Sequence, residues 1–195
     1  MAAVGLFLLM YQWGNQYKQP DQRTPALTGV LIRPPQTLPE FALSDANGDP
    51  FGRADLIDRW SLMAIAPIGD ARGHLGIARL VEIFNRLADR PKLQHRMRLL
   101  LISADVAPRL ARDFERLSPS ITVLSGERTE FETLSAAALG ADLHAAADSL
   151  PALFLIDDSA RLTALFPASQ FAAAVGADVA ALANWDHSRI AISDE

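Results

Sequence analysis

Asp70 and His74 are the residues whose types and spacing come nearest to a chemical site in this chain. They are four positions apart, so a helix would place both side chains on one face. A carboxylate and an imidazole in that arrangement can bind Cu(II), Zn(II) or Ni(II), with His144 as a further ligand. Alternatively, Asp70 caps the helix and His74 is a first-turn surface residue, since Asp is a favoured N-cap. We expect the structural role, because two protein ligands are too few for tight binding.

The loop that contains this pair is rich in glycine and offers a second kind of site. Residues 69–76 (GDARGHLG) include Arg72 and precede a predicted helix, whose first N–H groups suit a phosphate or a carboxylate. The glycine spacing matches neither the dinucleotide-binding motif nor the P-loop. A flexible connecting loop without a ligand is therefore the favoured interpretation.

The other polar and sulfur-containing candidates favour structural roles. Asp157 and Asp158 resemble a catalytic carboxylate pair, but at the end of a strand they are more typical of a turn. Met63 and Met97 fall inside apolar runs, where core packing is expected rather than copper binding. No serine in the chain has the sequence context of a catalytic nucleophile. We therefore assign no catalytic, cofactor-binding or metal-binding residue and expect no cofactor.

The composition excludes several classes of chemistry. The 195-residue chain has no cysteine, so it forms no disulfide, thiolate metal site or cysteine nucleophile. Its net charge is -5, which gives it no general attraction to nucleic acid, and we predict no such partner. Basic residues gather at 86–98, which we interpret as a solvated helix end and loop. His95 in this stretch and His187 near the C-terminus are expected to be exposed.

The elements that must position these residues alternate between strand and helix. Residues 61–66 (SLMAIA) form an apolar run typical of a strand buried on both faces, and apolar residues recur at helical spacing from Leu75 to Ala88. The turn-rich stretch 45–50 predicts a β-hairpin before them. Further strands are predicted at 97–103, 121–124, 150–157 and 161–166, and further helices at 108–117, 127–139 and 169–184. This order predicts an α/β fold with a central mixed sheet flanked by helices and an N-terminal β-hairpin.

The chain divides into four predicted parts. They are a short apolar membrane anchor (1–17), a proline-rich linker (18–37), the α/β domain (38–184) and a C-terminal tail (185–195). Residues 2–13 are almost wholly apolar but fall short of the roughly 20 that span a bilayer, so an interfacial segment or a buried helix stays open. Lys18 and Arg23 follow the anchor and no basic residue precedes it, a pattern that by itself opposes export. Residues 29–33 could form a short edge strand within the linker.

Four stretches, in this order, resemble the thioredoxin superfamily, particularly its SCO-like and peroxiredoxin-like branches. They are 38–51 (LPEFALSDANGDPF), 56–60 (LIDRW), 99–105 (LLLISAD) and 150–157 (LPALFLID). The resemblance implies a thioredoxin-like fold over about three-quarters of the chain. Thioredoxin-like proteins place a cis-proline beside the active site in the last of these stretches, so the resemblance favours a cis bond before Pro151, while a simple strand entrance is the alternative.

The resemblance also shows what this chain lacks. SCO proteins carry a C-x-x-x-C motif at the strand-to-helix junction together with a distal histidine, and they serve copper-site assembly in cytochrome c oxidase. Asp70 and His74 fall near the two cysteine positions here, and residues 149–151 near the distal histidine. The chain is thus identified as similar to a degenerate SCO-like protein that has lost its redox and metal site.

This resemblance implies a non-catalytic, membrane-anchored protein, an assembly or scaffold factor for a respiratory cytochrome oxidase. Its expected partners are oxidase subunits and, through the N-terminus, the lipid bilayer, with the domain on the extracytoplasmic side. Two alternatives stay open. One is a low-affinity copper-binding chaperone that uses Asp70 and His74, and the other is a cytoplasmic peroxiredoxin-like remnant.

Overall fold

The computed structural model describes residues 25–139 and 150–193. Within these ranges the strands form one eight-stranded sheet in the order β1-β8-β7-β4-β5-β6-β2-β3. The strands are β1 (Val30–Thr37), β2 (Ala42–Ser44), β3 (Pro50–Gly52), β4 (Trp60–Ile65), β5 (Met97–Ser103), β6 (Ile121–Ser125), β7 (Leu153–Ile156) and β8 (Arg161–Phe166). The helices are the 3-10 helix η1 (Arg53–Leu56) and the α-helices α2 (Ala71–Asn85), α3 (Pro91–Arg96), α4 (Pro108–Leu117), α5 (Arg128–Leu139) and α6 (Ala172–Ser193).

The centre of the sheet is built from three parallel strands. β4 pairs with β5 and β5 with β6 in parallel, while β7 joins the other side of β4 in the antiparallel direction. Every residue of β4 is buried, as the apolar run at 61–66 predicts. The parallel pairs require helical crossovers, which α2 with α3 and then α4 supply. The predicted mixed α/β sheet is therefore confirmed.

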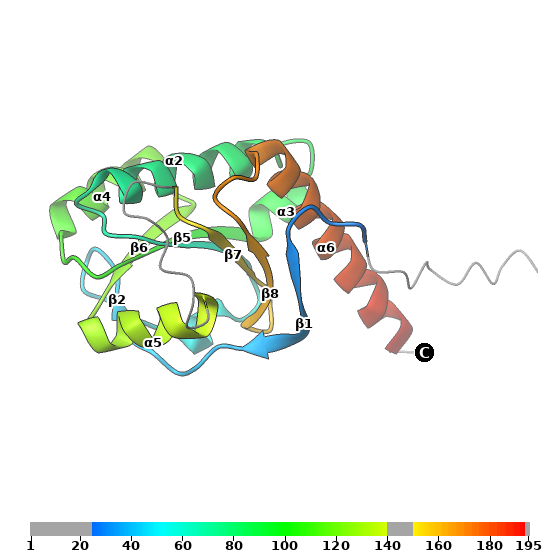
Figure 1. Cartoon of the computed structure of the whole chain (residues 1–195), viewed down its shortest axis with the longest axis horizontal. Helices are drawn as coiled ribbons and strands as arrows, with labels where there is room; N and C mark the ends of the chain where they lie inside the picture. The colour runs from blue at the N-terminus through cyan, green and yellow to red at the C-terminus, as the bar shows by residue number, and fades with distance from the viewer. Residues whose placement is uncertain (1–24, 140–149, 194–195) are drawn as a thin grey trace, which may run out of the picture.

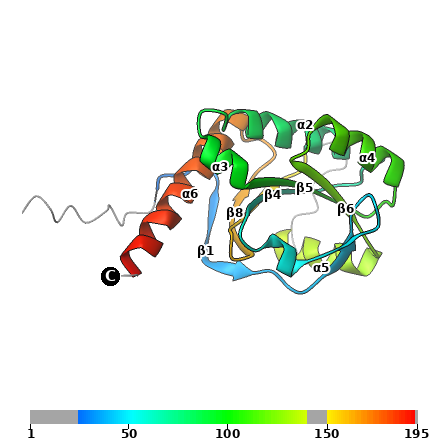
Figure 2. The same ribbon diagram turned by 180° about the vertical axis from the view of Figure 1, so that it is seen from behind.

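Helices cover both faces of the sheet, as Figures 1 and 2 show. On one face the apolar side of α2 packs with α6 and α4 over alternate residues of the strands, and its core includes Leu80, Ile83 and Val179. On the other face α5 contributes Leu134 to a second core with Met63 and the hairpin. The three-layer arrangement follows from these two cores, because each strand alternates its side chains between them.

The N-terminal hairpin of β2 and β3 confirms the prediction from its turn residues. Asp45 Oδ1 accepts hydrogen bonds from the backbone N–H groups of Asn47 at 2.8 Å and Asp49 at 2.9 Å. Gly48 adopts a φ of 91°, which only glycine reaches at little cost. The hairpin adds to the sheet through β2, which pairs with β6.

The predicted linker needs a correction. The short edge strand allowed at 29–33 is found, but it is longer than expected: residues 30–37 form β1, which pairs antiparallel with β8. The register shifts between Leu31 and Gln36, and this irregularity accommodates Pro34 and Pro35, whose missing N–H groups would break a regular ladder. Buried Asp178 of α6 holds the preceding residues, accepting hydrogen bonds from the backbone N–H groups of Thr28 at 3.0 Å and Gly29 at 2.8 Å.

Three further expectations differ from the structure. Helix α6 continues to Ser193, past the predicted end at residue 184 and through most of the predicted tail. Residues 91–96, predicted as loop, form the short helix α3, which Pro91 favours because proline suits the first helical position. The cis bond that the resemblance favours before Pro151 is not found, and the alternative of a strand entrance holds: in the described ranges the cis peptide bond joins Arg33 to Pro34.

The predicted anchor (1–17) lies outside the described residues, as do His144 and the linker up to residue 24. In the ranges 25–139 and 150–193, no helix is long and apolar enough to cross a membrane.

Candidate functional site

The junction between β4 and α2 lies where the resemblance places the reactive site of thioredoxin-like proteins. After β4 the chain stays bound to β5: the Ala66 N–H donates to the Ile102 carbonyl at 3.0 Å. The Ile68 N–H then donates to Ser103 Oγ, also at 3.0 Å. Both bonds fix the junction at the carboxyl ends of the parallel strands, the usual location of sites in open α/β sheets.

Asp70 is the N-cap of α2, as its structural interpretation predicts. Its Oδ1 accepts hydrogen bonds from the backbone N–H groups of Arg72 at 2.9 Å and Gly73 at 3.2 Å. These amides are among those that the first turn of a helix leaves without an intrahelical partner. The negative charge also lies at the positive end of the helix dipole. One oxygen of the Asp70 carboxylate therefore stabilises the first turn of α2.

His74 lies on the exposed side of the first turn of α2, which confirms its prediction as a surface residue. Its ring centroid is 5.2 Å from that of Phe114 on α4, with the planes tilted by 58°. No group of three His, Cys, Asp or Glu side chains in the described ranges could hold a metal ion. With Asp70 engaged by backbone amides, this part of the chain does not fit the copper ion that SCO-like proteins handle.

The glycines of the junction serve close packing. A Cβ at Gly73 would lie 2.2 Å from the Pro67 carbonyl oxygen, so the first turn of α2 rests directly on the preceding backbone. A Cβ at Gly76 would lie 3.0 Å from Cγ of Pro151. The Gly73 amide is already bound to Asp70, which removes it from any anion cradle. These contacts support a connecting role for residues 69–76 and weigh against an anion site there.

Arg79 is a residue of this region that the sequence analysis did not single out. Its side chain is buried, and it donates to the carbonyl oxygens of Pro151 at 3.0 Å, Pro167 at 2.8 Å and Gln170 at 2.8 Å. Burial lowers the pKa of Arg79, opposed in part by the nearby Glu82 carboxylate. Arg79 thus ties α2 to the loops before β7 and after β8. The sequence signal for its burial is its helical spacing: Arg79 lies three residues after Gly76 and four before Ile83, both on the buried side of α2.

The aspartate pair shapes a turn, as predicted. Buried Asp157 accepts hydrogen bonds from the backbone N–H groups of Ser159 at 3.0 Å and Arg161 at 2.9 Å, and from the Arg161 side chain. Asp158 forms an ion pair with Arg96, at 2.6 Å. The two carboxylates are therefore each bound to different partners.

The remaining candidates lie apart from the junction. Met63 and Met97 are buried in the core, as predicted, and His95 is exposed on α3. The side chain of His187 lies outside those described. The junction therefore brings together a capping carboxylate, a surface imidazole and a buried guanidinium, an arrangement without a nucleophile.

Solved structures establish the fold, whereas no protein-family profile and no curated protein matches the chain. The crystal structure of yeast Sco1 has 15% sequence identity and a TM-score of 0.62, and the match covers 77% of this chain and 99% of that one. The solution structure of apo Sco1 from Thermus thermophilus has 19% identity and a TM-score of 0.61, covering 81% and 96%. A thiol:disulfide interchange protein of the thioredoxin family from Chlorobium tepidum has 15% identity and a TM-score of 0.53, covering 76% and 96%.

These similarities define the class of structure: the chain has a thioredoxin-like fold. Within that class the fold is of the SCO type, and it lacks the C-x-x-x-C motif because the sequence contains no cysteine.

Proposed function

We propose that this protein is a non-enzymatic assembly factor for a respiratory cytochrome oxidase. The observation that carries the proposal is the SCO-type fold whose reactive junction has been replaced by structural residues. Asp70 caps a helix, Gly73 packs on backbone, and His74 faces solvent. Such a scaffold has the fold of the SCO proteins but not their thiol chemistry.

The functions of similar structures support this direction. BsSco is a member of the Sco family of cytochrome c oxidase assembly proteins, and it contains a disulfide switch. Yeast Sco1 has been solved with copper bound. The disulfide chemistry does not transfer to a cysteine-free chain, and the described residues do not offer a copper site. Protein contacts during assembly need neither cysteine nor copper, so we propose that this chain keeps that role.

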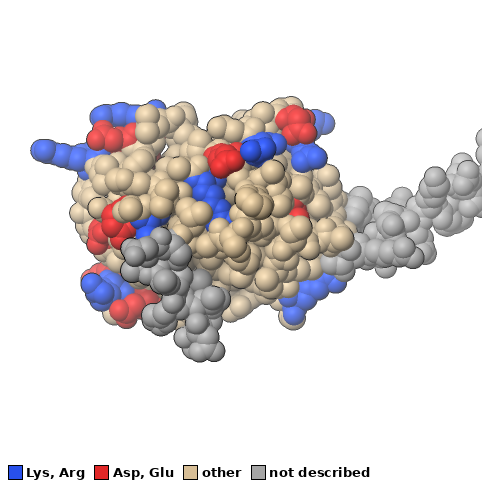
Figure 3. Space-filling view, turned by 45° about the horizontal axis from the view of Figure 1, so that its top comes forward, with Lys and Arg blue, Asp and Glu red and all other residues tan. Residues whose placement is uncertain are grey.

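Exposed apolar side chains border the junction and suit a protein partner. Leu75 in the first turn of α2 is 45% exposed, Val106 in the loop after β5 is 71% exposed, and Phe171 beside Gln170 is 83% exposed. Figure 3 shows this side as mostly uncharged surface, with basic and acidic side chains at its centre and in small groups around its margin. We propose that these three side chains contribute to an interaction surface, because contiguous exposed apolar side chains are typical of protein–protein sites.

We further propose that residues 1–17 anchor the protein in a membrane and that the domain lies on the extracytoplasmic side. The apolar character of residues 2–13 and the lipoprotein nature of a SCO1/SenC family member from Bacillus anthracis support this arrangement. Membrane fractionation of the native protein tests it. Recovery of the full chain in the soluble cytoplasmic fraction would instead favour the peroxiredoxin-like remnant.

Deletion and complementation test the assembly role. We expect a deletion strain to lose assembled oxidase, and we expect the wild-type chain and the His74→Ala variant to restore it equally, because no metal ligand is required. Oxidase activity and the amount of assembled complex are the measurements. Full rescue of the deletion by added copper salts alone, or failure of His74→Ala to complement, would show that copper delivery is the function instead.

A further inference from the structure

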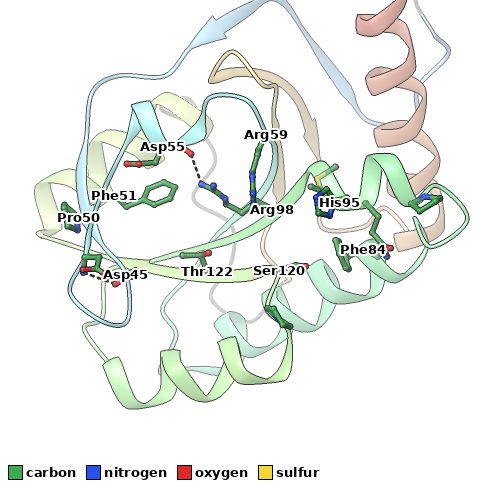
Figure 4. A pocket seen from close by; sticks show the side chains of 15 residues that line it. Asp45, Pro50, Phe51, Asp55, Arg59, Phe84, His95, Arg98, Ser120 and Thr122 are labelled. Atoms are coloured by element: carbon green, nitrogen blue, oxygen red, sulfur yellow. Dashed lines mark hydrogen bonds between the residues drawn. The ribbon is translucent and has the colours of Figure 1, made fainter.

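A groove of about 680 Å³ lies where the parallel strands begin, at the opposite end of these strands from the junction. Its walls are the β2–β3 hairpin with η1 on one side and α3 on the other, and its floor includes Arg98 of β5 and Thr122 of β6 (Figure 4). A volume in this range is typical of small-molecule sites. Nothing in the roles described above uses this groove.

Two arginines share the middle of the groove. Arg59 immediately precedes β4, and Arg98 is the register partner of Ser61 in the neighbouring strand. Arg59 lies in the bend before the strand, and both arginines line the groove near enough for Arg59 to act on the charge of Arg98. Figure 4 shows their guanidinium groups side by side.

Arg98 is held in a fixed orientation. Its Nη1 donates to the carbonyl oxygen of Asp55 at 2.7 Å, and its guanidinium carbon lies 5.3 Å from the centre of the Phe51 ring. Among the residues that the structure describes, no carboxylate forms an ion pair with Arg98, although the Asp55 carboxylate lies near enough to act on its charge. A guanidinium has five N–H donors, and Asp55 takes only one of them.

The positive charges of Arg59 and Arg98 repel each other, and an anion between them would relieve this repulsion. Burial and the nearby Arg59 both lower the pKa of Arg98, and Asp55 opposes them only in part. Within the described residues Arg59 makes no hydrogen bond or ion pair. Asp45, Asp49 and Asp55 also line the groove, and Asp55 offsets part of the charge of Arg98. Oxygens of Asp45 and Asp55 are engaged by backbone amides of their own loops, and none of the three carboxylates forms a described ion pair with either arginine.

We infer that this groove binds a small molecule through an oxyanion, a carboxylate or a phosphate, placed between Arg59 and Arg98. Guanidinium groups bind both oxyanions through paired, charge-assisted hydrogen bonds, and an anion between them removes their mutual repulsion. The hydroxyl groups of Ser120 and Thr122 line the same groove and supply further donors, while Phe51 offers an apolar wall. Binding arises from this local pair, since the chain as a whole carries a charge of -5.

Titration calorimetry of the full chain with inorganic phosphate and, separately, with succinate tests the inference. We expect saturable binding of at least one of them, and the stronger binder identifies whether phosphate or carboxylate is the natural group. Arg98→Met and Arg59→Gln should each weaken that binding about tenfold, the scale of one lost charge-assisted contact. Raising the salt concentration should weaken it as well.

The matched control is Arg109→Gln, which removes the same charge from an exposed position on α4 outside the groove. It should bind as the wild type does. Arg59 is exposed, so its variant keeps the test valid if Arg98→Met fails to fold. The inference is overturned if neither anion binds saturably, or if binding is unchanged in Arg59→Gln or equally weakened in the control.

Discussion

Replacing Asp70 by alanine should destabilise the protein by about 1 kcal/mol, within the roughly 0.5–2 kcal/mol that N-cap losses cost. Asp70 Oδ1 satisfies two backbone amides, those of Arg72 and Gly73, and alanine leaves both without this acceptor. Asp70→Asn keeps a cap of nearly equal quality and loses only the charge at the helix N-terminus, worth about 0.3–1 kcal/mol. We therefore expect the asparagine variant to lie between alanine and wild type.

Urea unfolding of the full chain measures this difference. With a slope of about 2 kcal/mol per molar urea, a loss of about 1 kcal/mol lowers the midpoint by roughly 0.5 M without a change in slope. Calorimetric titration with Cu(II) supplies the second readout, and we expect the three proteins to give the same curve. An alanine variant as stable as wild type would refute the capping role. Micromolar Cu(II) binding that is lost in both Asp70→Ala and His74→Ala would show that the pair is a metal site.

Three further substitutions test the packing and the surface around the junction. Gly73→Ala should destabilise the protein by about 1–3 kcal/mol, because its Cβ would lie 2.2 Å from a backbone oxygen. The control Gly176→Ala, whose Cβ would lie 3.4 Å from its nearest atom, should be neutral or stabilising. Equal urea midpoints for the two variants would contradict this difference. Asp178→Ala should cost about 2–3 kcal/mol by leaving the amides of Thr28 and Gly29 unpaired, and thermal unfolding that matches wild type would show that this anchoring of β1 is dispensable. Phe171→Ser should change stability by less than about 0.5 kcal/mol yet reduce co-purification of oxidase subunits; unchanged capture would exclude this side chain from the interface.

Local patterns were enough to predict the centre of the fold. The apolar run of β4 can lie only in a sheet buried on both faces, and Asp70 precedes a helical pattern in the position that an N-cap requires. The turn-forming residues of the hairpin act within a few positions of one another, so their effect is visible in the sequence. The exposed position of His74 followed from the same helical register.

Tertiary context decided the features that the sequence did not predict. An edge strand was expected only at 29–33, yet β1 continues through Pro34 and Pro35 because Asp178, far along the chain, holds its start and β8 offers a free edge. Arginine usually lies at the surface, so a buried Arg79 was not expected, but three carbonyl oxygens in two distant loops accept its hydrogen bonds. The groove depends on the register between β4 and β5, which no local pattern specifies.

Affinity capture of the tagged full chain from detergent-solubilised membranes tests the proposed function most directly. We expect cytochrome oxidase subunits to co-purify at levels well above those obtained with an unrelated tagged membrane protein. Capture should persist under reducing conditions and in the presence of a copper chelator, because neither a disulfide nor a metal is required for the contact. Recovery of the intact, folded chain without oxidase subunits, or loss of those subunits on copper chelation, would contradict the account.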